Sequence, residues 1–426
     1  MSILIKSVKV VDKGSPYDGQ VVDIFTKQGT IINIGESLEV EADEIVNIPN
    51  LCVSVGWCDL RVHGRNPGFE QKENFESLTK AAVNGGFTDI VLLPNTQPII
   101  QSKEAISFIK GASESSRINF WPLAAATHNC EGKDINELLD LNSAGAIGFS
   151  DGEKAVSSPD SLLKILQYLG QFKGLFMNRP EETKLNVFGQ INEGLVSNLL
   201  GLKGLPAVSE HLAIQRDLNL MDYLGENGTN VRYHFSTIST AKSVQLIREA
   251  KQNGKKITCD IAAHQLIFTE SDLQTFDPNF KVMPPFRSAE DIEALWAGLA
   301  DGTIDAIVSD HCPHDPESKN LEFDLAEFGI IGLETLFSSI NKINTKLRYP
   351  QLIEKLSYHP RKILGLASIT IRVNEPAHFT LFETGLKWIF EEKDIQSKSK
   401  NTPFIGKNML GKVHGVVVNG KLTYAE

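Results

Sequence analysis

The chain has 426 residues, of which 41% are apolar and 22% are charged, so it is globular and long enough for one large domain and a smaller one. Its net charge of -11 argues against nonspecific binding to nucleic acid, which needs a basic face. The five cysteines form no CxxC pair, which argues against a disulfide framework or a thiolate zinc site and predicts a cytoplasmic protein. No apolar run approaches ~20 residues and the N-terminus lacks the apolar stretch of a signal peptide, so neither a membrane span nor secretion is expected.

Short strands separated by turns are predicted at both ends of the chain. Residues 1–50 contain several such runs, and residues 367–426 return to the same pattern, with a turn at Asn419 and Gly420 between two strand-like segments. We therefore expect residues 1–50 and 367–426 to form one small β-sandwich domain composed of both termini.

A different pattern fills residues 51–366, where short apolar segments alternate with longer helical stretches. The predicted strands are residues 51–60, 88–95, 118–125, 146–150, 174–178, 231–235, 256–262 and 305–310. Several of the helical stretches end in glycine, as helix C-caps commonly do. Eight strands with helices between them over roughly 300 residues predict a (β/α)₈ TIM barrel.

Polar residues gather where the predicted barrel strands end, which is where this fold places its chemistry. They include Asp59, Arg61, His63, Arg65, Asp151, Asn178, Arg179, His234, Asp310, His311 and His314. Carboxylates and imidazoles around an open coordination position are what metal-assisted hydrolysis needs. A lone histidine at a strand end is more often a hydrogen-bonded structural residue. The run from Asp310 to His314 is stronger evidence for a site, with a self-capping turn as the less favoured alternative.

Arg61 is the unusual member of this set. Arg61 and His63 lie two residues apart after an apolar strand, so an extended backbone points both side chains the same way. Two histidines there would form a metal-ligand pair, but arginine is permanently charged and has no lone pair to offer a metal ion.

Several segments together resemble the dihydroorotase family of the amidohydrolase superfamily, of the type associated with aspartate carbamoyltransferase. The segment GWCDLRVHGRNPG at residues 56–68 is similar to the family's G-x-x-D-x-H-x-H-x-R-x-P-G. Similar matches are GGFTDIVLLPNTQP at 85–98, GTIDAIVSDHCPH at 302–314 and NTPFIGKNMLGKV at 401–413. The resemblance implies a TIM barrel with a composite β-sandwich, a zinc cofactor, and the reversible closure of carbamoyl aspartate to dihydroorotate.

The resemblance also implies roles for individual residues. The metal positions fall on His63, Asp151, His234 and Asp310, and Asp310 is also the catalytic aspartate. The substrate-binding positions fall on Arg65, Asn95, Asn279 and His314. Two ligand histidines of the family are replaced, by Arg61 and Asn178. Further departures are Gly152 in place of the second Asp of S-D-D-G, Ala263 and Gln265 in the P-H-H-L segment, and Met283 where Asn is usual.

These departures lead to a main hypothesis. A guanidinium at position 61 places a positive charge where a dication would sit. Repulsion between the two charges at close range costs several kcal/mol, whereas the guanidinium can pair favourably with Asp310 or Asp151. Asn178 is a poor zinc ligand beside imidazole. We therefore expect zinc to be absent or weakly bound, and the protein to be a catalytically impaired family member that scaffolds or regulates aspartate carbamoyltransferase, as a homo-oligomer that still binds a carboxylate such as dihydroorotate or carbamoyl aspartate.

Two alternatives remain open from the sequence. One is an active dihydroorotase with a rearranged single-metal site built on His63, Asp151, His234 and Asp310. The other is a hydrolase with a different substrate, for which Met283 and Gln265 would be the pocket residues to examine.

Overall fold

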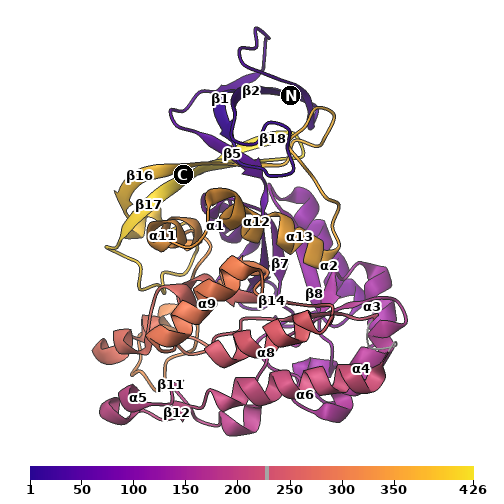
Figure 1. The fold of residues 1–426 in the computed structure, drawn as a ribbon, viewed down its shortest axis with the longest axis vertical. Coiled ribbons are helices and arrows are strands. Elements are labelled where there is room, and N and C mark those ends of the chain that lie inside the picture. Colours follow the sequence, from indigo (N-terminus) through magenta and orange to yellow (C-terminus); the bar gives the residue numbers. More distant parts are fainter. Residues whose placement is uncertain (226–229) are drawn as a thin grey trace.

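The computed structural model describes residues 1–225 and 230–426, which form a closed barrel and a second sheet beside it (Figure 1). The barrel strands are β6 (Trp57–Val62), β7 (Phe87–Leu92), β8 (Asn119–Ala124), β9 (Gly148–Phe149), β10 (Leu175–Asn178), β13 (Arg232–Phe235), β14 (Ile257–Ala262) and β15 (Ala306–Val308). Neighbouring strands pair in parallel, and the first and last meet where the His63 amide donates to the His311 carbonyl at 2.9 Å. The predicted TIM barrel is confirmed, with all eight of its predicted strands.

Helices cover the outside of the barrel and connect its strands. The longer ones are α1 (Phe75–Gly85), α2 (Lys103–Ser115), α3 (Leu138–Ala144), α4 (Pro159–Gly170), α6 (Val208–Leu224), α8 (Ala241–Gln252), α9 (Ala289–Asp301), α11 (Leu336–Ile343), α12 (Tyr349–Leu356) and α13 (Tyr358–Leu364). Shorter elements are α5 (Leu195–Leu200), α10 (Pro316–Lys319) and a small pair of strands, β11 (Ile191–Asn192) and β12 (Gly204–Leu205). Asn74 caps the start of α1 with its side chain, and Gly86 ends the helix at a φ of 86°. The apolar faces of these helices pack on the strands to form the main core.

The second sheet joins both ends of the chain, in the order β18-β17-β16-β5-β1-β2-β3 with β4 beside β1. Its strands are β1 (Ser2–Val10), β2 (Val21–Lys27), β3 (Thr30–Gly35), β4 (Glu44–Val46), β5 (Cys52–Val55), β16 (Phe379–Ile389), β17 (Asn408–Val418) and β18 (Lys421–Tyr424). Strand β5 lies between β1, which is parallel to it, and β16, which is antiparallel. Figure 1 shows this sheet at one end of the molecule, beside α1, α11 and α12.

The predicted strand at residues 51–60 is two strands in the structure. Its first half, β5, belongs to the terminal sheet, and its second half, β6, begins the barrel. Gly56 lies between them, and a Cβ atom there would come within 2.2 Å of Thr88 Oγ1. A glycine therefore lets the chain pass from one sheet to the other in close contact with β7.

Among the residues that the structure describes, no helix combines the length and the apolar character that crossing a bilayer would require.

Candidate functional site

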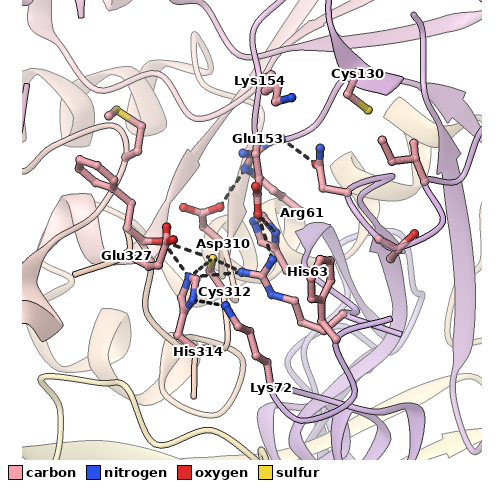
Figure 2. A pocket seen from close by; sticks show the side chains of 18 of the residues that line it. Arg61, His63, Lys72, Cys130, Glu153, Lys154, Asp310, Cys312, His314 and Glu327 are labelled. Atoms are coloured by element: carbon pink, nitrogen blue, oxygen red, sulfur yellow. Dashed lines mark hydrogen bonds and ion pairs between the residues drawn. The ribbon is translucent and has the colours of Figure 1, made fainter. Parts of the chain in front are cut away.

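A pocket of about 550 Å³ opens at the ends of the barrel strands, and its wall is strongly charged (Figure 2). The ionisable or thiol-bearing residues that line it are Arg61, His63, Arg65, Lys72, Cys130, Glu153, Lys154, Arg179, Asp310, Cys312, His314 and Glu327. Arg61 lies near the end of β6, and the others lie in the loops that follow β6, β8, β9, β10 and β15. Five Lys and Arg side chains and three carboxylates line its wall, so an excess of positive charge suits the pocket to an anionic ligand even though the chain as a whole is acidic.

Arg61 and Asp310 form a buried ion pair at the base of this pocket. Arg61 Nε donates to Asp310 Oδ1 at 2.8 Å, and the two side chains are only 3% and 8% exposed. The guanidinium nitrogens Nη1 and Nη2 also lie 3.4 and 3.3 Å from the Gly152 carbonyl oxygen. Burial raises the pKa of Asp310, and the charge of Arg61 opposes that rise. The sequence allowed Arg61 to pair with Asp310 or with Asp151, and the pair with Asp310 is the one in the structure.

The backbone around this pair is fixed by a second buried carboxylate. Asp59 accepts a hydrogen bond from the Arg61 amide at 3.0 Å and another from the Ser309 amide at 2.9 Å. Because Arg61 is on β6 and Ser309 follows β15, Asp59 joins the first and last barrel strands next to the ion pair. Burial raises the pKa of Asp59 to about 7.

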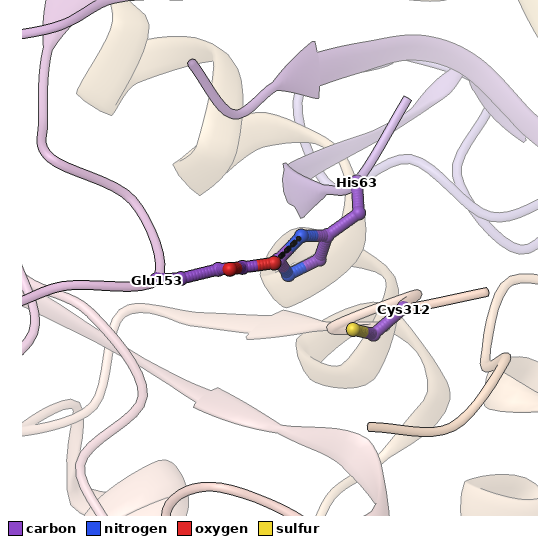
Figure 3. Close-up of side chains that lie close together, drawn as sticks. All are labelled: His63, Glu153 and Cys312. Atoms are coloured by element: carbon purple, nitrogen blue, oxygen red, sulfur yellow. Dashed lines mark ion pairs between the residues drawn. The ribbon is translucent and has the colours of Figure 1, made fainter. Parts of the chain in front are cut away.

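A cluster of three side chains lies next to the ion pair, and we call His63, Glu153 and Cys312 the His–Glu–Cys cluster (Figure 3). One ligand atom from each lies within 4.8 Å of the others. Arg65 contacts two of them, with Nη1 at 3.1 Å from Glu153 Oε1 and Nη2 at 3.2 Å from Cys312 Sγ. Burial disfavours the charged forms, but His63 and Arg65 hold the pKa of Glu153 well below its ordinary value. Despite burial, His63 and Arg65 also hold the pKa of the Cys312 thiol well below its usual range.

His314 lies on the other side of Cys312. Its Nε2 atom is 3.5 Å from Cys312 Sγ and 3.0 Å from the Phe328 carbonyl oxygen, and its Nδ1 atom is 3.2 Å from Lys72 Nζ. The His314 backbone amide donates to the Asn401 side chain at 3.0 Å. These contacts fix the imidazole at the pocket wall, where Figure 2 shows it beside Lys72 and Cys312.

Asn95 also lines the pocket, and it organises the loop after β9. Its Nδ2 atom donates to the Asp151 carbonyl at 3.1 Å, and its Oδ1 atom accepts from the Glu153 amide at 2.8 Å. Gly152 lies between these two contacts at a φ of 64°, and a Cβ atom there would come within 1.8 Å of Asn95 Oδ1. Any side chain at position 152 would therefore clash with Asn95 as it lies here.

Six of the predicted site residues line one pocket, namely Arg61, His63, Arg65, Asn95, Asp310 and His314. The other four, Asp151, Asn178, His234 and Asn279, are not in its wall.

Contacts with other residues account for the positions of three of them, Asp151, Asn178 and His234. The Asp151 carboxylate accepts from the amide and hydroxyl of Thr127, and the two ring nitrogens of His234 lie 2.8 Å from Thr258 Oγ1 and Asp260 Oδ2. The Asn178 amide oxygen accepts from the Val156 amide at 3.1 Å, and its Nδ2 atom donates to Asp217 and Tyr233. Asn279 lies in a short 3₁₀ segment of the loop after β14.

Sequence reasoning missed Glu153, Cys312 and Lys72 as pocket residues. Cys312 lies within the Asp-His-Cys-Pro-His run, where the carboxylate and the imidazoles are the stronger signals for a site. Glu153 follows the predicted ligand Asp151 by two residues, and the turn at Gly152 directs it into the pocket. Lys72 lies in the loop before α1, where the sequence offers no sign of its contact with His314.

Comparison with known proteins identifies relatives over the whole chain. A family model described as Dihydro-orotase-like matches residues 51–243, and a model of the amidohydrolase family matches residues 209–423. Dihydroorotase of Geotalea daltonii is 37% identical over 428 residues, covering 100% of this chain and 99% of the relative. Dihydroorotase of Geobacter sp. (strain M21) is 36% identical with the same coverage.

Solved structures show the same fold at lower identity. The L-hydantoinase (dihydropyrimidinase) of Arthrobacter aurescens superposes with a TM-score of 0.86 at 24% identity, covering 99% of this chain and 96% of its own. The dihydropyrimidinase of Brevibacillus agri NCHU1002 gives a TM-score of 0.82 at 20% identity, covering 100% and 95%.

Proposed function

Because this chain belongs to the dihydroorotase family of the amidohydrolase superfamily, we propose that it is a dihydroorotase-like protein of pyrimidine biosynthesis with impaired hydrolytic activity. In this proposal it serves as a scaffold or regulator of aspartate carbamoyltransferase, the enzyme with which this type of dihydroorotase is associated. The family resemblance drawn from the sequence motifs is confirmed. The observation on which the impairment rests is the buried ion pair between Arg61 and Asp310.

The ion pair supports impairment in two ways. Amidohydrolases of this kind need a metal ion to lower the pKa of its bound water to about 7, and a carboxylate to move the proton. Arg61 has no lone pair to offer a metal ion, and its guanidinium neutralises Asp310, the carboxylate implied as the catalytic group. A dication beside this guanidinium would meet a like charge at close range.

The other predicted metal positions support the same conclusion. The Asn178 side-chain oxygen accepts a hydrogen bond from the Val156 amide, and both ring nitrogens of His234 have polar partners. The Asp151 carboxylate is oriented by Thr127. This set of donors does not suit a zinc ion, because the atoms that would ligate it already have partners within the protein.

The pocket nevertheless keeps features of a site for a small carboxylate. Arg65, Lys72 and His314 provide cationic or hydrogen-bonding groups, and Asn95 lies beside them. Their arrangement around a pocket of about 550 Å³ supports binding of an anion the size of dihydroorotate or carbamoyl aspartate.

Two measurements on the untagged chain test this function. The first is turnover of dihydroorotate and carbamoyl aspartate with zinc supplied, and we expect no rate above the background. The second is co-elution with the aspartate carbamoyltransferase of the same organism in size-exclusion chromatography, and we expect a complex. Turnover at an ordinary enzymatic rate would contradict the impairment, and a stable homo-oligomer that never binds the transferase would contradict the scaffold role.

An active enzyme with a rearranged metal site is the second candidate, and one observation favours it. The His–Glu–Cys cluster brings a nitrogen, an oxygen and a sulfur donor together inside the pocket. This set shares only His63 with the ligands expected for a rearranged site. Turnover of dihydroorotate that requires Glu153 and Cys312 would select this candidate.

A further inference from the structure

We propose that the outer face of α6 is the contact through which two copies of this chain form a twofold-symmetric dimer. Figure 1 shows this helix on the outside of the barrel, at the end of the molecule away from the terminal sheet. Exposed positions recur every three or four residues along α6 and lie on one side of it. We call them the α6 stripe: Val208, Leu212, Gln215, Asn219 and Tyr223.

Most of the charged side chains of α6 point into the protein. The buried Glu210 carboxylate accepts a hydrogen bond from the Ser239 amide at 2.9 Å. Asp217 is also buried, and Arg216 Nη2 lies 2.7 Å from its Oδ1 atom. A helix on the surface of a soluble domain normally turns its charged residues towards water, so α6 is unusual in holding three of them inside.

The apolar members of the α6 stripe face solvent instead. Val208, Leu212 and Tyr223 are 46%, 49% and 77% exposed. Gln215 and Asn219, which lie between them, are exposed and uncharged. Apolar side chains aligned along one exposed helix face indicate a surface that another protein covers.

The charge of the α6 stripe favours a second copy of this chain as the covering surface. The chain has a net charge of -11, so identical copies repel each other on average. The stripe itself has no charged residue, and Asp222 at its edge forms an ion pair with Lys255. Two copies can therefore approach along this face without like-charge repulsion, whereas a strongly charged partner would find no complementary charge there.

The order of residues along the α6 stripe is also self-complementary. Val208 and Leu212 lie towards one end, Tyr223 lies at the other, and Gln215 lies at the middle. A twofold axis beside Gln215 packs the two helices antiparallel, so that Val208 meets the partner's Tyr223. The two Gln215 side chains then meet at the axis, where each amide can both donate to and accept from the other.

The size of the contact shows that α6 forms its centre rather than all of it. A standard interface buries about 800 Å² on each partner. The 17 residues of α6 span about 25 Å, and a helix about 10 Å wide gives a footprint of roughly 250 Å². The loop before β11 extends the apolar surface at the start of α6, because Leu185, Val187 and Phe188 are exposed there. This loop is joined to α6 by the Glu182 amide, which donates to Ser209 Oγ at 2.9 Å.

The proposed dimer is independent of the pocket. No residue of the α6 stripe lines the pocket at the barrel mouth. Dimer formation therefore requires neither ligand binding nor hydrolysis, and it can be measured without a substrate.

The first test is the mass of the untagged full-length chain in solution, measured by sedimentation equilibrium. We expect a dimer for the parent and a monomer for Leu212→Arg, which places a charge in the stripe and should raise the dissociation constant by more than about 30-fold. Leu139→Arg is the matched control, because Leu139 on α3 is also 49% exposed but lies outside the stripe. We expect this variant to remain a dimer.

The second test locates the twofold axis by disulfide cross-linking. The five native cysteines are buried, so a new exposed cysteine is the one available for a link between copies. Under mild oxidation we expect Gln215→Cys to form a covalent dimer, because its side chains meet at the axis. Gln245→Cys, at an exposed position of α8, should remain unlinked.

Three results would overturn the proposal: a monomeric parent, a dimer that persists in Leu212→Arg, or equal cross-linking of Gln215→Cys and Gln245→Cys. A monomeric parent whose co-elution with aspartate carbamoyltransferase is lost in Leu212→Arg would assign the α6 stripe to the transferase. The dimer would then be excluded while the scaffold role proposed above would stand, so the two proposals fail by different measurements.

Discussion

Replacement of Arg61 by methionine tests the buried ion pair directly. Met keeps much of the length of the side chain but leaves Asp310 charged, buried and without its cation. At 2.8 Å and an effective dielectric constant of about 20, the attraction between the two charges is about 6 kcal/mol. Since removal of one partner of a buried pair typically costs about 3–5 kcal/mol, we expect Arg61→Met to lower the free energy of unfolding by that amount at pH 7.

The pH dependence of this loss follows from Asp310. Burial already raises the pKa of Asp310 in the parent protein, and removal of the opposing Arg61 charge raises it further. A carboxyl with a folded pKa above its unfolded value binds more protons when folded, so its unfavourable contribution shrinks as the pH falls. The deficit of Arg61→Met should therefore be smaller at pH 5 than at pH 7.

Urea unfolding of four proteins at both pH values measures the effect: the parent, Arg61→Met, Asp310→Leu and the double variant. The double variant removes both charges and should recover most of the stability lost in Arg61→Met. Equal unfolding midpoints for the parent and Arg61→Met at pH 7 would refute the reasoning. A deficit that is the same at pH 5 and pH 7 would show that lost packing, rather than an unpaired charge, is responsible.

Three further predictions concern metal binding, pH and backbone strain. The double variant Arg61→His with Asn178→His should bind at least one more equivalent of zinc than the parent, measured by elemental analysis; an unchanged metal content would mean that the remaining donors are not recruited. Burial raises the pKa of Glu334 to about 8, so the parent should lose stability as the pH rises from about 4.5 to 8. Glu334→Gln should remove most of this pH dependence in thermal unfolding. Melting temperatures of the two proteins that change in parallel with pH would contradict this. Gly152→Ala should destabilise the protein by roughly 1–3 kcal/mol, because its Cβ meets Asn95 and its φ is positive; an unchanged melting temperature would show that the loop adjusts freely.

The sequence was sufficient to place the barrel because its strands are buried apolar runs separated by amphipathic helices. It was less informative at the junction near Gly56, where one continuous apolar run serves two sheets. Periodicity carries no sign of that division, since both halves are fully buried. The division depends instead on the close approach of Gly56 to Thr88, which is a tertiary contact.

The site was predictable to the extent that residues at strand ends point into the barrel mouth. This rule placed Arg61, His63 and Asp310 in one pocket. It did not apply to His234, whose two ring nitrogens have polar partners on the neighbouring strand β14. Nor did it identify Glu153, whose direction is set by a left-handed turn at Gly152 that depends on contact with Asn95.

The position of β5 in the terminal sheet has a consequence for biosynthesis. Because β5 pairs with β1 on one side and with β16 on the other, the N-terminal strands cannot complete their sheet until residues 379–389 have been made. The strands β1 to β5 are made before the barrel strands, yet their sheet is among the last parts of the structure to be completed. Until then the edge of β5 is exposed, and a chain that stalls before β16 presents an open strand edge to chaperones and to other nascent chains.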